Sequence, residues 1–107
     1  MTEIPDVIGR YVAATNARDV EAMTACFAPD ATVRDEGRRY AGRAEIRAWE
    51  AEVTEKYGLS SELLEIERDG DALRASMRVS GTFPGSPAVL HYHFRIKDRL
   101  IAQLEIG

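Results

Sequence analysis

The sequence lacks several features that would assign a function at once. It has a single cysteine, Cys26, which excludes an internal disulfide and favours a reducing, cytoplasmic location. Its longest apolar runs have four residues, too short for a membrane-spanning helix or a signal-peptide core. No run of basic residues is present and the formal net charge is −4. We therefore expect neither a membrane nor nucleic acid as a partner.

The sequence also lacks the motifs that are typical of common enzyme reactions and metal sites. The sequence contains no phosphate-binding loop, no nucleophile elbow and no paired-cysteine metal motif. What remains is a chain of 107 residues with 45% hydrophobic and 30% charged residues, typical of a folded domain. We expect one domain over residues 1–107, because this length buries one ordinary core.

Helical spacing of apolar residues dominates the first half of the sequence. The pattern predicts a first helix from Ile4 to Thr15, with Thr2 as a candidate cap. Asp19 can cap a short second helix that includes Phe27 and ends at Pro29-Asp30. The sequence then predicts a short strand at Ala31–Asp35, a turn at Gly37, an extended piece at Tyr40, and a third helix from about Arg43 to Tyr57, capped by Gly58.

Alternation with a period of two dominates the second half, and it predicts four strands with one apolar face each. Leu64 and Ile66 are expected to share one face of the first of these strands. In the last strand the apolar face is expected to carry Leu100, Ala102, Leu104 and Ile106. Helices followed by an antiparallel meander indicate an α+β fold. A curved, mainly antiparallel sheet would wrap the three N-terminal helices and enclose a space.

Asp35 is the first candidate site residue. It shares its side of the predicted strand with Ala31 and Val33, so its carboxylate would face the core. Such a placement is costly unless the group is hydrogen-bonded or functional, and loss of water would raise its pKa toward that of a useful base. The alternative is a strand-end aspartate that points to solvent or caps a turn.

Four further residues lie on or near apolar faces. Tyr11 and Tyr92 carry hydroxyl groups that need partners when buried, and these could donate to a ligand oxygen or belong to an ordinary core. Trp49 is either core or a pocket wall. Glu50 follows it directly and is expected in solvent unless it is drawn inward.

Other chemistry-bearing residues favour structural roles. His91 and His93 share a strand face, a spacing that can bind a metal, but Arg95 lies on the same face and no carboxylate of that strand does. A polar outer sheet face explains them better, and we expect no metal and no organic cofactor. Cys26 lies beside Phe27 without a nearby histidine, so packing is expected rather than a nucleophile.

Four segments together resemble a known family. They are Arg10-Tyr-Val-Ala-Ala-Thr-Asn-Ala-Arg-Asp19, Phe27-Ala-Pro-Asp-Ala-Thr-Val-Arg-Asp35, Gly42-Arg-Ala-Glu-Ile-Arg47 and His93-Phe-Arg-Ile96. They resemble the ketosteroid isomerase and SnoaL-like group of the nuclear transport factor 2-like superfamily. The resemblance covers nearly the whole chain and implies a cone-shaped α+β barrel. It says less about the reaction, because this fold carries isomerases, cyclases, dehydratases, hydrolases and non-enzymes.

The resemblance also implies roles for single residues. Tyr11 matches an oxyanion-hole tyrosine and Asp35 matches the catalytic base, with the same separation of 24 positions. Tyr92 stands where the family has a protonated aspartic acid, Glu50 replaces a supporting tyrosine, and the loop from Asp35 to Gly42 is about two residues shorter. These departures weigh against steroid isomerisation itself.

Together these observations predict an acid–base enzyme acting on a small apolar carbonyl compound. Asp35 would remove a proton next to the carbonyl, with Tyr11 and Tyr92 as donors to the enolate. Trp49, Phe94, Met77 and Glu50 would line the pocket. The alternative is a non-catalytic ligand-binding or dimeric interaction module of the same fold. Because relatives often dimerise through the outer sheet face, we also expect a homodimer.

Overall fold

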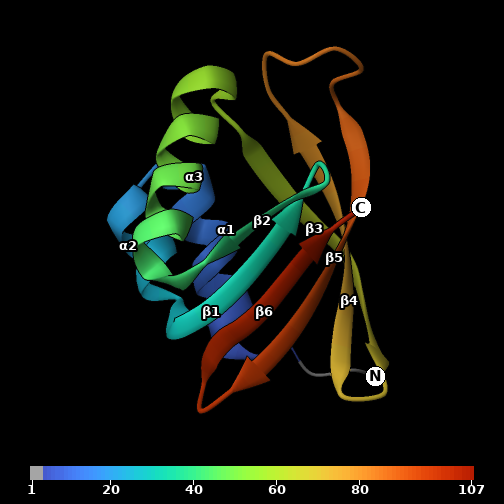
Figure 1. Cartoon of the computed structure of the whole chain (residues 1–107). Coiled ribbons are helices and arrows are strands. Elements are labelled where there is room, and N and C mark those ends of the chain that lie inside the picture. The colour runs from blue at the N-terminus through green and yellow to red at the C-terminus, as the bar shows by residue number, and fades with distance from the viewer. Residues whose placement is uncertain (1–3) are drawn as a thin grey trace.

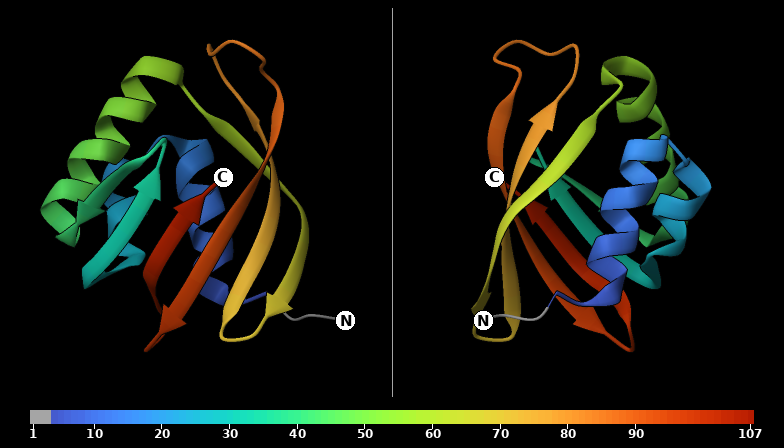
Figure 2. Two further views of the ribbon diagram at one scale, coloured as in Figure 1. Left: turned by 45° about the vertical axis from the view of Figure 1, so that its right-hand side comes forward. Right: turned by 180° about the vertical axis from the view of Figure 1, so that it is seen from behind.

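The computed structural model describes residues 4–107, which form three helices and six strands (Figure 1). The helices are α1 (Asp6–Ala17), α2 (Val20–Ala25) and α3 (Gly42–Tyr57). The strands are β1 (Phe27–Asp35), β2 (Arg38–Ala41), β3 (Ser60–Asp69), β4 (Ala72–Ser80), β5 (Ala88–Lys97) and β6 (Leu100–Ile106). Figure 2 shows the three helices together on one side of a strongly curved sheet. The predicted α+β fold is confirmed, while the cap expected at Thr2 lies outside the described residues.

All six strands belong to one sheet in the order β2-β1-β6-β5-β4-β3. Neighbouring strands are antiparallel except β1 and β6, which are parallel. The sheet is therefore mainly antiparallel, as predicted. α3 packs against β1 and β2 at one edge, and α1 packs against β3 at the other. The helices thus cover the concave face of the sheet.

The helix ends follow the predicted chemistry at two positions. The side chain of Asp19 accepts a hydrogen bond from the backbone nitrogen of Ala22 at 3.1 Å and caps α2. Gly58 ends α3 with a φ of 57°, a left-handed conformation that glycine adopts without steric cost. α3 thereby stops where the chain must turn back into β3.

Phe27 was expected in the second helix, and that expectation is wrong. α2 ends at Ala25, Cys26 caps it, and Phe27 begins β1. The Cys26 carbonyl accepts a hydrogen bond from the backbone nitrogen of Ile101 at 2.8 Å, which ties this corner to β6. Pro29 cannot extend a helix, so the chain enters the sheet earlier than apolar spacing indicated. The Cys26 thiol is buried, and burial raises its pKa, as expected of a packing residue.

Two strand faces also differ from the alternation in the sequence. The β3–β4 register shifts between Leu63 and Glu65, so Leu63 is half-buried while Leu64 is 42% exposed. The β5–β6 register shifts between Arg95 and Ile96, and Ile101 is fully buried. A bulge adds one residue to one strand and reverses the faces beyond it. Leu64 therefore does not share an inward face with Ile66, and Ile101 replaces Leu100 in the core.

The core lies between the helices and the concave sheet face. Its largest fully buried side chains come from all layers: Phe27, Phe94, Ile8, Met23, Ile46, Met77, Ile101, Leu104, Val33 and Val79. Within residues 4–107, no helix combines the length and the apolar character that a bilayer crossing requires.

Candidate active site

A cavity of about 530 Å³ opens between α1, α3 and the concave face of the sheet. Its volume lies within the range of small-molecule sites, roughly 300–1,000 Å³. Buried side chains at its inner end include Tyr11, Trp49, Glu50 and Tyr92. Exposed residues mark its mouth: Glu36, Arg38, Glu52, Lys56 and Pro84. The cavity is therefore a pocket with a polar rim and a buried floor that carries ionisable groups.

Asp35 lies at the end of β1, where the chain turns into β2, and its carboxyl group faces this cavity. The side chain is half-buried and accepts a hydrogen bond from Trp49 Nε1 at 3.3 Å. Burial raises the pKa of Asp35 above its ordinary value of 3.8, and the neighbouring Glu36 charge adds to the rise. Hydrogen bonds from Trp49 and from the Glu36 backbone lower the pKa in part. Asp35 is thus a positioned carboxylate of increased basicity.

Glu50 is the main departure from what the sequence suggested for this helix. Its side chain turns inward from α3 and is only 4% exposed. Within residues 4–107, no hydrogen-bond partner reaches its Oε2 atom. Burial raises the pKa of Glu50 from 4.5 to about 8, hydrogen bonding with Tyr11 lowers it, and the Asp35 charge raises it. Glu50 is therefore mostly protonated at neutral pH, so it is a neutral acid and not a solvated anion.

Tyr11 and Tyr92 both line the cavity, from α1 and β5. The Tyr11 ring packs in T-shaped contacts with the rings of Phe27 and Phe94, with ring centres 5.5 and 6.3 Å apart. Burial raises the pKa of both phenols, and the Glu50 charge adds to the rise. Both hydroxyl groups therefore stay protonated and can donate a hydrogen bond to a ligand.

Trp49 connects the wall of the cavity to the carboxylate of Asp35. Its ring stacks on Tyr40 with ring centres 5.7 Å apart, while its Nε1 donates to Asp35. Tyr40 comes from β2 and Asp35 from β1, so one side chain of α3 fixes both strands of this hairpin. Trp49 is a pocket wall and also a positioning residue for Asp35.

The structure brings five of the seven predicted site residues together and leaves two out. Tyr11, Asp35, Trp49, Glu50 and Tyr92 line the cavity, but Met77 and Phe94 do not. Both are fully buried, because the Tyr11 ring covers Phe94 and Met77 lies inside the core cluster. The expectation that these two side chains form pocket walls is corrected in favour of Val79 and Leu90, which come from the same two strands.

Several lining residues were not anticipated. Val53 and Tyr57 follow Trp49 at helical spacing, so the apolar stripe of α3 could have identified them. Phe83, from the loop after β4, and the mouth residues Arg38 and Lys56 left no comparable pattern in the sequence. The placement of Phe83 depends on how its loop folds, whereas Arg38 and Lys56 reach the mouth from β2 and α3.

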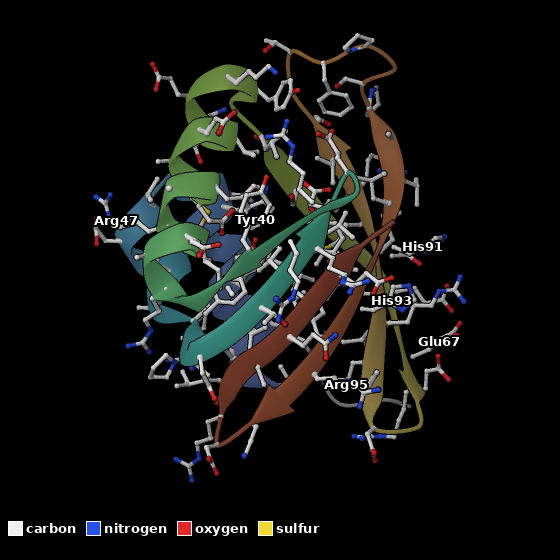
Figure 3. All side chains as sticks on the ribbon, in the orientation of Figure 1. Tyr40, Arg47, Glu67, His91, His93 and Arg95 are labelled. Atoms are coloured by element: carbon white, nitrogen blue, oxygen red, sulfur yellow. The ribbon has the colours of Figure 1, made fainter. Side chains whose placement is uncertain are left out.

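His91 and His93 do not line the cavity. Figure 3 shows His91, His93 and Arg95 on the side of the sheet that faces away from the helices, with Glu67 on the same side. His91 Nδ1 is 3.4 Å from Ser76 Oγ, and His93 lies opposite Glu105 in the strand register. Among residues 4–107, no group of three or more His, Cys, Asp or Glu side chains could hold a metal ion.

Comparisons with known proteins agree with this architecture. The sequence profile of the SnoaL-like domain matches residues 8–104. A candidate polyketide cyclase from Sinorhizobium meliloti has 42% sequence identity, a TM-score of 0.92, and coverage of 97% of this chain and 95% of its own. No curated protein matches at a significant level.

Two more distant structures share the fold. One is a hypothetical protein with a ketosteroid isomerase-like fold from Catenulispora acidiphila, in complex with trimethylamine (20% identity, TM-score 0.85, coverage 98% and 86%). The other is an epoxide hydrolase/cyclase-like enzyme of pyran ring formation in the polyether salinomycin (18% identity, TM-score 0.81, coverage 94% and 86%). At these identities the likeness concerns the fold alone.

Proposed function

The chain belongs to the SnoaL-like domain family, and from that premise we propose that it is an acid–base enzyme of the isomerase or cyclase type. Its reaction would begin with removal of a proton next to the carbonyl group of a small apolar substrate. The observation that carries this proposal is the placement of Asp35. A half-buried carboxylate, held by Trp49 Nε1, lines the same cavity as the hydroxyl of Tyr11.

Asp35 acts as the base in this scheme. At neutral pH it is ionised, and its raised pKa makes it a stronger base than an aspartate in water. The hydrogen bond from Trp49 fixes the direction of the carboxylate, which reduces the entropy lost on reaching the transition state. The proton moves from the substrate carbon to Asp35, and the C–H electron pair becomes the new carbon–carbon double bond of an enolate.

Tyr11 acts as the hydrogen-bond donor to the enolate oxygen, and Tyr92 is a second candidate donor. Negative charge develops on the carbonyl oxygen when the proton leaves, and a neutral, buried phenol stabilises that charge strongly. Return of the proton from Asp35 to a different carbon completes an isomerisation. Attack of the enolate carbon on a second carbonyl would instead close a ring.

The cavity supports a small substrate that has both apolar and polar groups. Apolar side chains form much of the wall around the ionisable groups: Val53, Leu59, Val79, Phe83, Leu90 and Ile106. A ligand of one or two rings suits a volume of about 530 Å³. The name of the Sinorhizobium relative favours a carbonyl-rich chain that cyclises, because that relative is described as a candidate polyketide cyclase.

A homodimer through the outer sheet face is part of the proposal. In the strand register Glu67 lies opposite Arg74, a pair of opposite charge, and Glu105 lies opposite His93. Arg78 Nη1 also donates to Glu62 Oε1 at 2.7 Å. Such a face is polar and carries charges of both signs, so a second copy could pair its charges with those of the first.

Exchange of α-protons in D₂O tests the proposal without knowledge of the natural substrate. Cyclopentanone, cyclohexanone and an apolar 1,3-diketone serve as probes, and proton NMR follows the loss of their α-signals. We expect the protein to accelerate exchange of at least one probe over buffer, and Asp35→Asn to abolish the acceleration. Asp30→Asn is the matched control, since Asp30 lies exposed on the same strand and outside the cavity.

Two results would oppose the proposal. Exchange rates equal to buffer for every probe would favour the non-catalytic ligand-binding module instead. Acceleration that survives in Asp35→Asn would remove Asp35 from its assigned role as base. A folded variant, shown by an unchanged circular dichroism spectrum, is required for either conclusion.

A further inference from the structure

We propose that Glu50 is a second catalytic residue, the acid that donates its proton to the substrate oxygen while Asp35 takes the proton from carbon. This inference deepens the proposed function and rests on it. Glu50 would take the donor position that the sequence comparison gave to Tyr92. Asp35 and Glu50 would then form an acid–base pair in one pocket.

The position of Glu50 on α3 is the first support. Trp49 and Glu50 are consecutive residues, yet Trp49 donates to Asp35 while Glu50 lies against Tyr11. One turn of one helix therefore orients the base and supplies the candidate acid.

The free oxygen of Glu50 is the second support. The side chain is more than nine-tenths buried and lines the cavity, and its Oε2 has no partner among the residues that the structure describes. Buried polar atoms are almost always hydrogen-bonded, because loss of water without a replacement costs free energy. An unpartnered carboxyl oxygen at a cavity wall is therefore suited to a ligand atom.

The groups around Glu50 determine its charge. They are Tyr11 from α1, Cys26 at the end of α2, Asp35 from β1 and Tyr92 from β5. None of these side chains is a cation, and Asp35 is an anion at neutral pH. Burial and the Asp35 charge together raise the pKa of Glu50 to about 8, so the proton is present when the enzyme works near neutral pH.

The chemistry also separates Glu50 from the two tyrosines. Burial raises the pKa of both phenols, so they can donate a hydrogen bond but give up their protons only at high pH. An acid with a pKa of about 8 can transfer its proton completely and recover it in the same cycle. Enzymes often divide the roles of base and acid between two carboxyl groups, because their surroundings give these groups different pKa values.

The step balances as follows. Asp35 takes the proton from the carbon, the C–H pair forms the new carbon–carbon double bond, and the carbonyl π pair moves to oxygen. The proton on Glu50 Oε2 moves to that oxygen, which leaves Asp35 neutral and Glu50 ionised. The enol then returns its O–H proton to Glu50, and Asp35 delivers its proton to a different carbon.

Pentafluorophenolate is a suitable probe, because it carries an enolate-like charge on one oxygen and stays anionic over the whole pH range of interest. Fluorine NMR measures its affinity between about pH 6 and 10. The measurement uses the Asp35→Asn chain, which mimics the base after it has taken the proton and removes its titration. Loss of the Asp35 charge moves the Glu50 pKa below about 8 in this chain, and above that midpoint we expect the affinity to fall roughly tenfold per pH unit as Glu50 ionises.

Glu50→Gln in the same background is the decisive comparison. An amide keeps a neutral donor of the same shape and does not titrate, so the steep loss of affinity at high pH should disappear. Glu55→Gln is the matched control, since Glu55 is an exposed carboxyl of α3 outside the cavity, and its profile should follow the parent. An identical pH profile in the Glu50→Gln chain would overturn the role of Glu50.

An infrared difference spectrum keeps the proposal testable if Glu50→Gln does not fold. Unsubstituted protein at neutral pH should show the C=O stretch of a protonated carboxylic acid, which vanishes above pH 9. Absence of that band at neutral pH would overturn the proposal. No binding of the phenolate at any pH would instead oppose the proposed function as a whole, so the two failures are distinguishable.

Discussion

Replacing Glu50 by glutamine should change how the stability of the protein depends on pH. The folded chain holds a proton on Glu50 up to about pH 8, whereas an unfolded chain releases it near 4.5. Between these values the folded state binds more protons, so the free energy of unfolding falls as pH rises. Below about pH 4.5 both states are protonated, and the residue contributes no pH dependence.

The size of the effect follows from the same two values. The interval from 4.5 to about 8, at about 1.4 kcal/mol per pH unit, amounts to roughly 5 kcal/mol. Between pH 5 and 7 alone the loss is about 2–3 kcal/mol. A domain of this size has a total stability of about 5–15 kcal/mol, so the effect is a large fraction of it. Glutamine at position 50 does not titrate and should abolish this part of the slope.

Urea unfolding of the parent chain and of Glu50→Gln at pH 5, 6, 7 and 8 provides the assay. The difference in unfolding free energy between the two chains should move in favour of Glu50→Gln by about 2–3 kcal/mol from pH 5 to 7. Glu55→Gln replaces an exposed carboxyl on the same helix and should follow the parent at every pH. Parallel curves for the parent and Glu50→Gln would refute a protonated, buried Glu50.

Three further predictions follow from the site and the outer sheet face. Tyr11→Phe should weaken phenolate binding by roughly 10- to 150-fold, since a hydrogen bond to a charged group contributes about 1.5–3 kcal/mol. Tyr92→Phe should have a smaller effect. Equal affinities of the parent and Tyr11→Phe for a series of phenols would contradict the role of Tyr11 as oxyanion donor. Trp49→Phe removes the donor to Asp35 and should raise the Asp35 pKa further in an NMR titration, whereas an unchanged midpoint would mean that the contact has no electrostatic effect. Light scattering at micromolar concentration should give the mass of a dimer, and a monomer would exclude the outer-face interface.

The fold was predictable because most local signals in this chain agree with one another. Asp19, Gly58 and the alternation in β4 and β5 each led to the observed element, since capping and period two depend on neighbouring residues only. The signals failed at Phe27, Leu64 and Leu100. At each of these positions a strand starts early or a register shift reverses the faces, which depends on the partner strand.

The site was predictable in part, for a similar reason. Asp35, Tyr11 and Tyr92 could be found from their place on apolar faces and from the resemblance to a family. The burial of Glu50 could not be predicted, because its position beside Trp49 fits either the edge of the apolar stripe or the solvent side of α3. Only the tertiary structure shows that its side chain turns inward and is 4% exposed.

The charge states of Asp35 and Glu50 carry the central claim, and carbon-13 NMR of selectively labelled carboxyl groups measures both directly. With Asp35→Asn and Glu50→Gln for assignment, we predict one aspartate midpoint moderately above 3.8 and one glutamate midpoint of about 8. At neutral pH one group would then be an ionised base and the other a protonated acid. A Glu50 midpoint near 4.5, or an Asp35 midpoint at or below 3.8, would contradict the account.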